Sequence, residues 1–225
     1  VDMFDFQGRQ LPETLAEVLD PRHAVLLAWD LQNDQAGGAF NKASLVETVP
    51  PVLAAATAAR VPTVWTRQTP YLWAEESPAW IRHTMRQQNV SHPKDLKPRR
   101  ARGSTGWELM PPFAPAPGDT VIDKRRPNGF LANDFEMLLA NRSLKTVVMV
   151  GCTTDGGVEA TVRDGYNRGY FMVVVRDCVG TYTREGHEAA LKRMERSADV
   201  IDSAELVDRK STRLNSSHGY ISYAV

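Results

Sequence analysis

The chain has 225 residues, of which 42% are hydrophobic and 24% charged, and this ordinary composition is enough for one domain with a sizeable core. Its formal net charge is zero, which argues against a nucleic-acid-binding surface and against a polybasic membrane anchor. No apolar run approaches the ~18 residues that a membrane span needs, and no secretory signal is recognised. The two cysteines, Cys152 and Cys178, lie far apart, so we expect free thiols in a reducing cytoplasm.

Short apolar, β-rich runs alternate with helix-like segments along the chain. Strands are predicted at 24–30, 61–67, 120–124, 146–151, 171–177 and 199–201. Helices are predicted at 49–60, 78–88, 133–141, 156–168 and 183–197, with Asn133 as the N-cap of its helix. Because proline disrupts a helix interior, Pro50 and Pro51 predict that the first of these helices begins at Val49. Residues 89–118 hold many Pro, Gly and basic residues and are interpreted as an excursion over the surface.

A parallel sheet with helices on both faces is the fold class that this pattern predicts. Strands that are apolar throughout and separated by helices are typical of parallel sheets. Right-handed crossovers then make an α/β fold, a three-layer α/β/α sandwich with a doubly wound, mainly parallel sheet of about six strands. We expect one domain over residues 1–209, with residues 1–20 as an N-terminal extension. Residues 210–225 are rich in Ser and Asn, lack a periodic pattern, and are interpreted as a non-native or disordered tail.

The carboxyl ends of the predicted strands carry the candidate functional residues. In open parallel sheets, ligands bind beyond these ends. Neither a G-x-G-x-x-G fingerprint nor a Walker loop is present, so the usual nucleotide-binding folds are unsupported. The residues at the strand ends include an acid, a base, an amide and a glycine-rich helix start, at Asp30, Arg67–Gln68, Lys124, Gly151–Gly157 and Asp177–Cys178.

Three motifs fall at these strand ends: W-D-L-Q-N-D at Trp29–Asp34, V-I-D-K-R-R-P-N-G-F at Val121–Phe130, and G-C-T-T-D-G-G-V-E-A-T at Gly151–Thr161. Together, and in this order, they resemble the isochorismatase-like hydrolases, also called the cysteine hydrolase superfamily. The resemblance covers residues 20–207, and the segment R-D-G-Y-N-R-G-Y at Arg163–Tyr170 supports it. It implies a hydrolase that acts on a small-molecule substrate and has the same α/β sandwich that the periodicity predicts.

Many members of this family use an Asp–Lys–Cys triad, and the resemblance carries only two of its members to this chain. The Asp matches Asp30 and the Lys matches Lys124. The nucleophilic Cys normally stands immediately before the V-x-x-T of the last motif, and here that position is Gly157. Cys152 instead matches the residue after the opening glycine of the motif and is interpreted as a buried residue of the strand.

The first functional hypothesis is a hydrolase that needs no thiol. Isochorismatases proper hydrolyse a vinyl ether, and some of them also have glycine at the nucleophile position. The segment W-T-R-Q-T-P at Trp65–Pro70 resembles that subgroup. The resemblance implies Asp30 as general acid, with Lys124 as its electrostatic partner, and backbone N–H groups near the helix start would bind anionic oxygen. The candidate substrate-binding residues are Gln68, Thr153, Thr154, Asp155, Gly156 and Arg67.

Two other hypotheses stay open. The form G-C-T-T-x-G-C-V occurs in amidohydrolases of the N-carbamoylsarcosine amidase type, and only its second cysteine is changed here, to Gly157. That glycine is then a natural or an engineered replacement of the nucleophile. The third hypothesis is a binding or scaffold protein that has kept the fold. Under the first hypothesis, the neighbouring cation Lys124 lowers the pKa of Asp30, whereas a general acid needs a raised pKa. Burial or the charge of the substrate then has to offset the effect of Lys124.

No cofactor and no metal are predicted. Nicotinamidase-type relatives hold zinc with an acid and histidines after the second strand, and T-R-Q-T-P-Y-L-W at 66–73 contains no such pair. The basic cluster Lys94–Arg102 is interpreted as a solvated loop, with a lid that attracts anionic substrates as the alternative. Because members of the family usually oligomerise through excursions like 70–118, we expect a homodimer or homotetramer.

Overall fold

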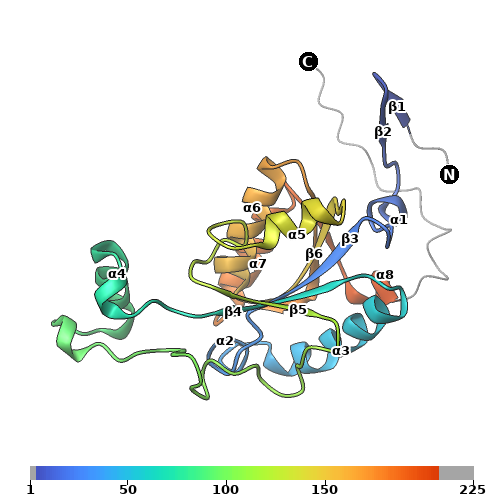
Figure 1. Cartoon of the computed structure of the whole chain (residues 1–225). Helices are drawn as coiled ribbons and strands as arrows, with labels where there is room; N and C mark the ends of the chain where they lie inside the picture. Colours follow the sequence, from blue (N-terminus) through green and yellow to red (C-terminus); the bar gives the residue numbers. More distant parts are fainter. Residues whose placement is uncertain (1–3, 208–225) are drawn as a thin grey trace.

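A six-stranded parallel sheet forms the centre of the molecule in the computed structural model, which describes residues 4–207 (Figure 1). The strand order is β5-β4-β3-β6-β7-β8, and every neighbouring pair is parallel. The predicted fold class is therefore confirmed, while the predicted tail at 210–225 lies outside the described residues. The strands are β3 (Ala24–Trp29), β4 (Thr63–Gln68), β5 (Thr120–Lys124), β6 (Thr146–Cys152), β7 (Phe171–Gly180) and β8 (Asp199–Ile201).

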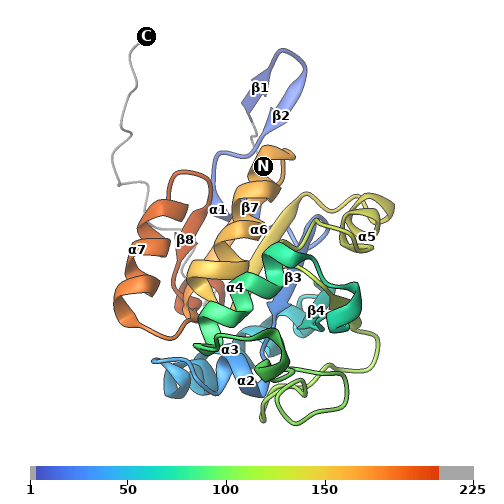
Figure 2. The same cartoon turned by 90° about the vertical axis from the view of Figure 1, so that its left-hand side faces the viewer.

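Two apolar clusters, one on each face of the sheet, form the core. The central strands β3 and β6 are buried along their whole length, as expected for strands covered on both sides. On one face the sheet packs against α1 (Leu15–Val18), α3 (Lys42–Ala58) and α8 (Ser203–Val207). On the other face lie α5 (Phe135–Asn141), α6 (Glu159–Asn167) and α7 (Arg184–Met194), as Figures 1 and 2 show.

Helix α3 begins earlier than its prolines predict. It starts at Lys42, so Pro50 and Pro51 lie inside it rather than in its first turn. The prediction of a start at Val49 is therefore wrong. A stripe of buried residues spaced three and four apart runs through the prolines, and burial of this stripe outweighs the backbone hydrogen bonds that they forfeit. The stripe consists of Leu45, Val49, Val52 and Ala56.

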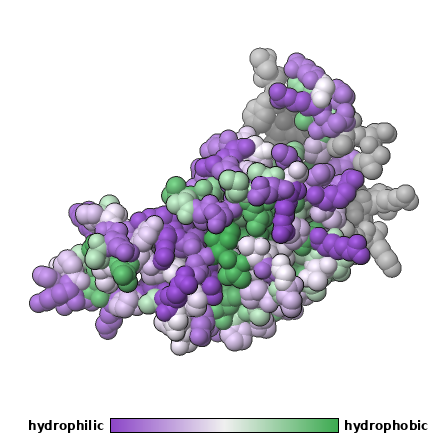
Figure 3. Space-filling view, viewed as in Figure 1, coloured by the Kyte–Doolittle hydropathy of each residue, from purple (hydrophilic) through white to green (hydrophobic). Residues whose placement is uncertain are grey.

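The segment between β4 and β5 leaves the body of the domain, as predicted for residues 89–118. Helix α4 (Pro78–Gln88) has the predicted bounds, is capped by the Ser77 side chain, and contains no buried residue. It projects away from the sheet in Figure 1. After it come η2 (Pro93–Asp95) and a long loop that returns to β5. Figure 3, in the same view as Figure 1, shows an apolar patch near the middle of the molecule, surrounded by mostly hydrophilic surface.

The remaining elements are short. Residues 1–20, predicted as an extension, include a hairpin of β1 (Phe4–Phe6) and β2 (Arg9–Leu11), whose residues are all exposed. Helix α2 (Asn33–Ala36) begins shortly after the end of β3. The helix predicted from 156 begins instead as a π-helical turn, Thr154–Val158, which continues into α6. This turn lies at the carboxyl end of β6, beside the end of β3.

Candidate active site

Asp30 stands directly after β3, where the chain turns sharply at the carboxyl edge of the sheet. Its backbone φ is 45°, in the left-handed region that residues other than glycine rarely adopt. Its N–H donates to the carbonyl and the hydroxyl of Thr66 on β4, at 3.2 and 3.1 Å. Backbone strain of this kind persists where the surrounding structure fixes it, and it clusters at functional sites.

The Asp30 carboxylate is buried and fully paired. Its Oδ2 accepts from Lys124 Nζ at 2.6 Å, and the two side chains are 2% and 1% exposed. Thr66 Oγ1 donates to Oδ1 at 2.7 Å, and Gln35 Nε2 donates to Oδ2 at 3.3 Å. Two of the three predicted catalytic positions, Asp30 and Lys124, are thus brought into direct contact by the ends of β3 and β5.

Lys124 is held by three groups at once. Besides Asp30, its Nζ donates to Gln68 Oε1 at 2.9 Å and lies 4.0 Å from the centre of the Trp29 ring. Burial lowers the pKa of Lys124, and the charge of Asp30 opposes this effect only in part. The buried ammonium therefore gives up a proton more readily than an exposed lysine does.

Gln68 locks this pair in place. Its side-chain oxygen accepts from Lys124, and its Nε2 donates to the carbonyl of Arg125 at 3.0 Å. Both ends of the amide are occupied, so Gln68 positions the lysine here rather than leaving a free group to orient water. The structure thus brings Gln68, predicted as a substrate-binding residue, to the site, where its side chain contacts Lys124 and the Arg125 backbone.

The glycine-rich turn brings its backbone to the site but directs its side chains elsewhere. Thr154 Oγ1 is 2.9 Å from His187 Nδ1, and Asp155 Oδ1 accepts from Thr181 Oγ1 at 2.5 Å. The N–H of Gly156 donates to the carbonyl of Thr153 at 3.2 Å. These hydrogen bonds tie the turn to itself, to Thr181, which follows β7, and to α7.

Arg67 also has a structural partner. Its Nε donates to Asp123 Oδ1 at 2.8 Å, and its guanidinium lies 3.9 Å from the centre of the Trp107 ring. Neighbouring residues of a strand point to opposite faces of the sheet. Because Thr66 and Gln68 face Asp30 and Lys124, Arg67 points the other way and fastens the returning loop to the sheet.

Three residues of the site are not among the predicted site residues, although two of them, Gln32 and Thr66, lie within the quoted motifs. Thr66 and Gln35 hold the Asp30 carboxylate, as described above. Gln32 exchanges hydrogen bonds with the backbone of Gln68, at 2.7 and 3.3 Å, and donates to the carbonyl of Trp107 at 2.7 Å. The alternation of residues along β4 could have identified Thr66 beside Gln68, whereas the contacts of the two glutamines depend on the path of the loop.

Neither cysteine is poised for reaction. Both are fully buried. Burial is the largest effect on each thiol, and it raises the pKa of Cys152 well above its ordinary range and that of Cys178 to about 12. The nucleophilic form of cysteine is the thiolate, and burial disfavours that form at both positions. The peptide bond between Cys152 and Thr153 is cis.

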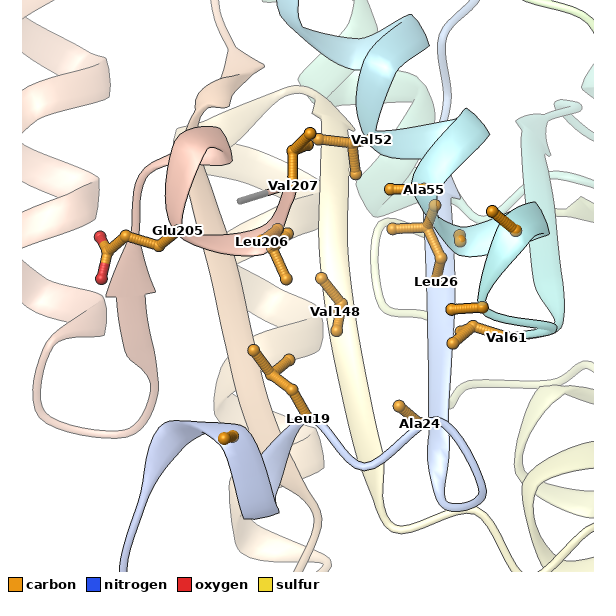
Figure 4. A pocket seen from close by; sticks show the side chains of 14 residues that line it. Leu19, Ala24, Leu26, Val52, Ala55, Val61, Val148, Glu205, Leu206 and Val207 are labelled. Atoms are coloured by element: carbon orange, nitrogen blue, oxygen red, sulfur yellow. The ribbon is translucent and has the colours of Figure 1, made fainter. Parts of the chain in front are cut away.

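Across 4–207, no three His, Cys, Asp or Glu side chains gather where they could hold a metal, and no helix is long and apolar enough to cross a membrane. A cavity of about 500 Å³ lies between α1, α3, α8 and the sheet (Figure 4). Its lining is apolar apart from Glu205, whose carboxylate points away from the other side chains in Figure 4. This cavity lies apart from Asp30 and Lys124.

Comparison with known proteins places the chain in a family. The sequence profile of the Isochorismatase domain matches residues 24–205. The ureidoacrylate amidohydrolase RutB of Methylobacterium radiotolerans is 32% identical over 214 residues, which cover 85% of this chain and 82% of that protein. RutB of Pseudomonas syringae pv. syringae is 30% identical, and the match covers 91% of each chain.

Solved structures share the fold. A cysteine hydrolase from Pseudomonas syringae pv. phaseolicola 1448A has a TM-score of 0.72 at 22% identity, over 86% of this chain and 95% of that one. N-carbamoylsarcosine amidase from Thermoplasma acidophilum has a TM-score of 0.65 at 22% identity, over 80% of this chain and 96% of that one. The profile spans most of the chain, and the two RutB relatives cover more than two thirds of it. The chain therefore belongs to the isochorismatase family of hydrolases.

Proposed function

We propose that the chain hydrolyses a small anionic metabolite by proton transfer through Asp30, without a cysteine nucleophile, and that the bond cleaved is a vinyl ether. The observation that carries this proposal is the buried contact of 2.6 Å between Lys124 and Asp30 at the strand ends. Proton transfer and water suffice for this reaction, and no covalent intermediate is needed. The only thiol in the glycine-rich motif, Cys152, is sealed in the sheet.

Lys124 removes the difficulty of an acid that lies beside a cation. In the proposed reaction, the Lys124 ammonium passes a proton to the Asp30 carboxylate through the hydrogen bond to Oδ2, and Asp30 passes a proton to the terminal carbon of the enol ether. Because burial lowers the pKa of Lys124, its ammonium can supply that proton. Water then adds to the oxocarbenium carbon, and the resulting hemiketal breaks down to a ketone and an alcohol.

Arg100 supports an anionic substrate. It stands in the returning loop with φ of 53°, and its buried Nε has no hydrogen-bond partner among residues 4–207. Burial is the main cause that lowers the pKa of Lys124, and the charge of Arg100 acts in the same direction. Other arginines around the strand ends are already engaged: Arg67 and Arg102 with Asp123, Arg126 with Glu76, and Arg125 with the carbonyls of Thr69 and Pro70.

Arg100→Ala is expected to raise KM by about 10- to 100-fold, the loss of one charge-assisted hydrogen bond to a substrate carboxylate. We expect kcat to change little, since Arg100 does not contact Asp30. Steady-state kinetics on the anionic substrate measure both constants. Arg99→Ala is the matched control, because Arg99 is the exposed neighbour in the same loop. An equal rise of KM in both variants would show general attraction by the basic loop rather than a specific contact.

Amide hydrolysis is the second candidate, and the relatives named ureidoacrylate amidohydrolase favour it. Without a thiol, water would attack the amide carbon directly, and Asp30 would accept its proton as general base. This route also uses the Asp30–Lys124 pair, so the pair alone does not distinguish the two reactions. The difference lies in the bond that breaks, which is carbon–oxygen in one case and carbon–nitrogen in the other.

Parallel assays decide between the two candidates. Purified protein is incubated with isochorismate, while pyruvate is followed enzymatically, and with ureidoacrylate and a panel of primary amides, while ammonia is followed. We expect release of pyruvate and no ammonia. Ammonia without pyruvate would replace the vinyl-ether proposal by the amide one. Failure to turn over either class, in protein that binds such metabolites by calorimetry, would contradict both and favour a binding protein.

A further inference from the structure

The indole of Trp29 fills the space in front of Gly157. A Cβ atom added at Gly157 would lie 2.2 Å from Trp29 Nε1, 2.7 Å from Cε2 and 2.8 Å from Cζ2. Real Cβ atoms essentially never approach other atoms within 3.0 Å. The contacting atoms belong to a rigid ring that is fully buried, so the ring cannot move aside as the end of a flexible side chain can.

A second glycine, Gly129, leaves space for another part of the Trp29 ring. A Cβ atom at Gly129, which follows β5, would lie 3.0 Å from Trp29 Cζ3 and 2.9 Å from Thr161 Cγ2. Thr161 joins the two glycines, because its Oγ1 accepts from the N–H of Gly129 at 3.0 Å and donates to the carbonyl of Gly157 at 2.7 Å. The indole therefore lies against two segments that are far apart in the sequence, and each provides a glycine where the ring passes.

Shape and charge hold the ring, rather than a hydrogen bond. Trp29 Nε1 is buried and has no acceptor among residues 4–207, although buried indole N–H groups usually find one. The ammonium of Lys124 lies 4.0 Å from the ring centre, within the range of a cation–π interaction. The same indole thus touches the lysine of the proposed acid pair on one side and Gly157 on the other.

We propose that Trp29 and Gly157 form one matched pair, in which the indole occupies the space of a nucleophilic side chain at position 157 and restricts the site to water as nucleophile. This inference rests on the proposed function, in which position 157 is the position of the family nucleophile. It also implies that Gly157→Cys alone does not restore thiol chemistry. The new side chain would overlap the ring, so both positions must change together.

A double-mutant cycle tests the pair through thermal unfolding, which needs no substrate. Gly157→Cys is expected to lower Tm by about 5–10 °C through overpacking, and Trp29→Ile by a similar amount through the void that it leaves. The double variant restores nearly the original side-chain volume, and isoleucine suits a central strand. We therefore expect its loss of Tm to be smaller than the sum of the two single losses by at least about 4 °C. Additive losses would overturn the proposal.

Gly156→Cys provides the matched control. A Cβ atom at Gly156 would meet Thr153 Oγ1 at 2.4 Å and has no close contact with Trp29. Trp29→Ile should therefore relieve the strain of Gly157→Cys but not that of Gly156→Cys. Equal relief of both would mean that removing the indole loosens the whole turn, and the specific pairing would be wrong. Because unfolding is measured without substrate, the cycle can fail or succeed independently of the vinyl-ether assay.

Alkylation tests whether the indole stands in the place of a nucleophile. Iodoacetamide, itself a small primary amide, is added to the folded double variant, and peptide mass spectrometry locates the adduct. The thiolate sulfur displaces iodide, so a sulfur–carbon bond forms as the carbon–iodine bond breaks. We expect an adduct at residue 157 and none at the buried Cys152 and Cys178. A folded, coupled double variant whose thiol at 157 stays unmodified would overturn this role for the indole.

Discussion

Asp30→Asn is expected to lower kcat by about 10²- to 10⁴-fold, the usual contribution of a positioned acid or base. Asparagine has the shape of aspartate, and its single side-chain oxygen can still accept from Lys124, while its amide NH2 faces the Thr66 hydroxyl, which can accept as well as donate. It carries no proton that could be passed to a substrate or taken from water. The loss should therefore fall on kcat, while KM, which depends on groups such as Arg100, changes less. Steady-state kinetics with the substrate found by the parallel assays measure both constants.

Asp34→Asn is the control for this loss. Asp34 belongs to the same W-D-L-Q-N-D motif but lies in α2, with its carboxylate against Gly106 of the returning loop. Its replacement should leave kcat within a few-fold of the original value. Circular dichroism of both variants establishes that they are folded. Undiminished turnover by Asp30→Asn would remove Asp30 from the reaction, whichever bond is cleaved.

The motifs predict which residues come together at the strand ends, because residues at the carboxyl ends of adjacent parallel strands lie close together in space. Asp30, Gln68 and Lys124 follow or end three strands that are adjacent in the sheet, β3, β4 and β5. Once the sheet is parallel, their side chains must converge at one edge. The same reasoning misplaces Arg67, since it considers the end of the strand but not the face on which each residue lies.

The role of Trp29 could not be predicted from the sequence. The residue appears in the first motif, yet its effect depends on where the indole lies relative to Gly129 and Gly157. Those contacts join three segments, and a glycine in a sequence does not reveal which side chain uses the space that it leaves. The π-helical start of α6 is similarly hidden, because a turn of this kind differs from an ordinary helix start by one hydrogen-bond step.

Lys124→Met is expected to cost about 3–5 kcal/mol of unfolding free energy, the usual effect of removing one partner of a buried ion pair. The variant leaves the Asp30 carboxylate, 2% exposed, with only the neutral donors Thr66 and Gln35. Methionine retains much of the length and packing of the lysine stem, so the loss reports mainly the uncompensated charge. Urea unfolding, fitted as a two-state transition, gives the change in free energy.

The double variant Asp30→Asn/Lys124→Met separates the charge from the packing. Replacing both partners removes the unpaired charge, so we expect it to recover most of the stability that Lys124→Met loses. It should nevertheless remain inactive, since no proton donor is left. Recovery of stability without activity would mean that the pair is kept for its chemistry rather than for folding. If the double variant is instead as unstable as the sum of the single ones, the pair is chiefly structural, and the reaction proposed for Asp30 loses its main support.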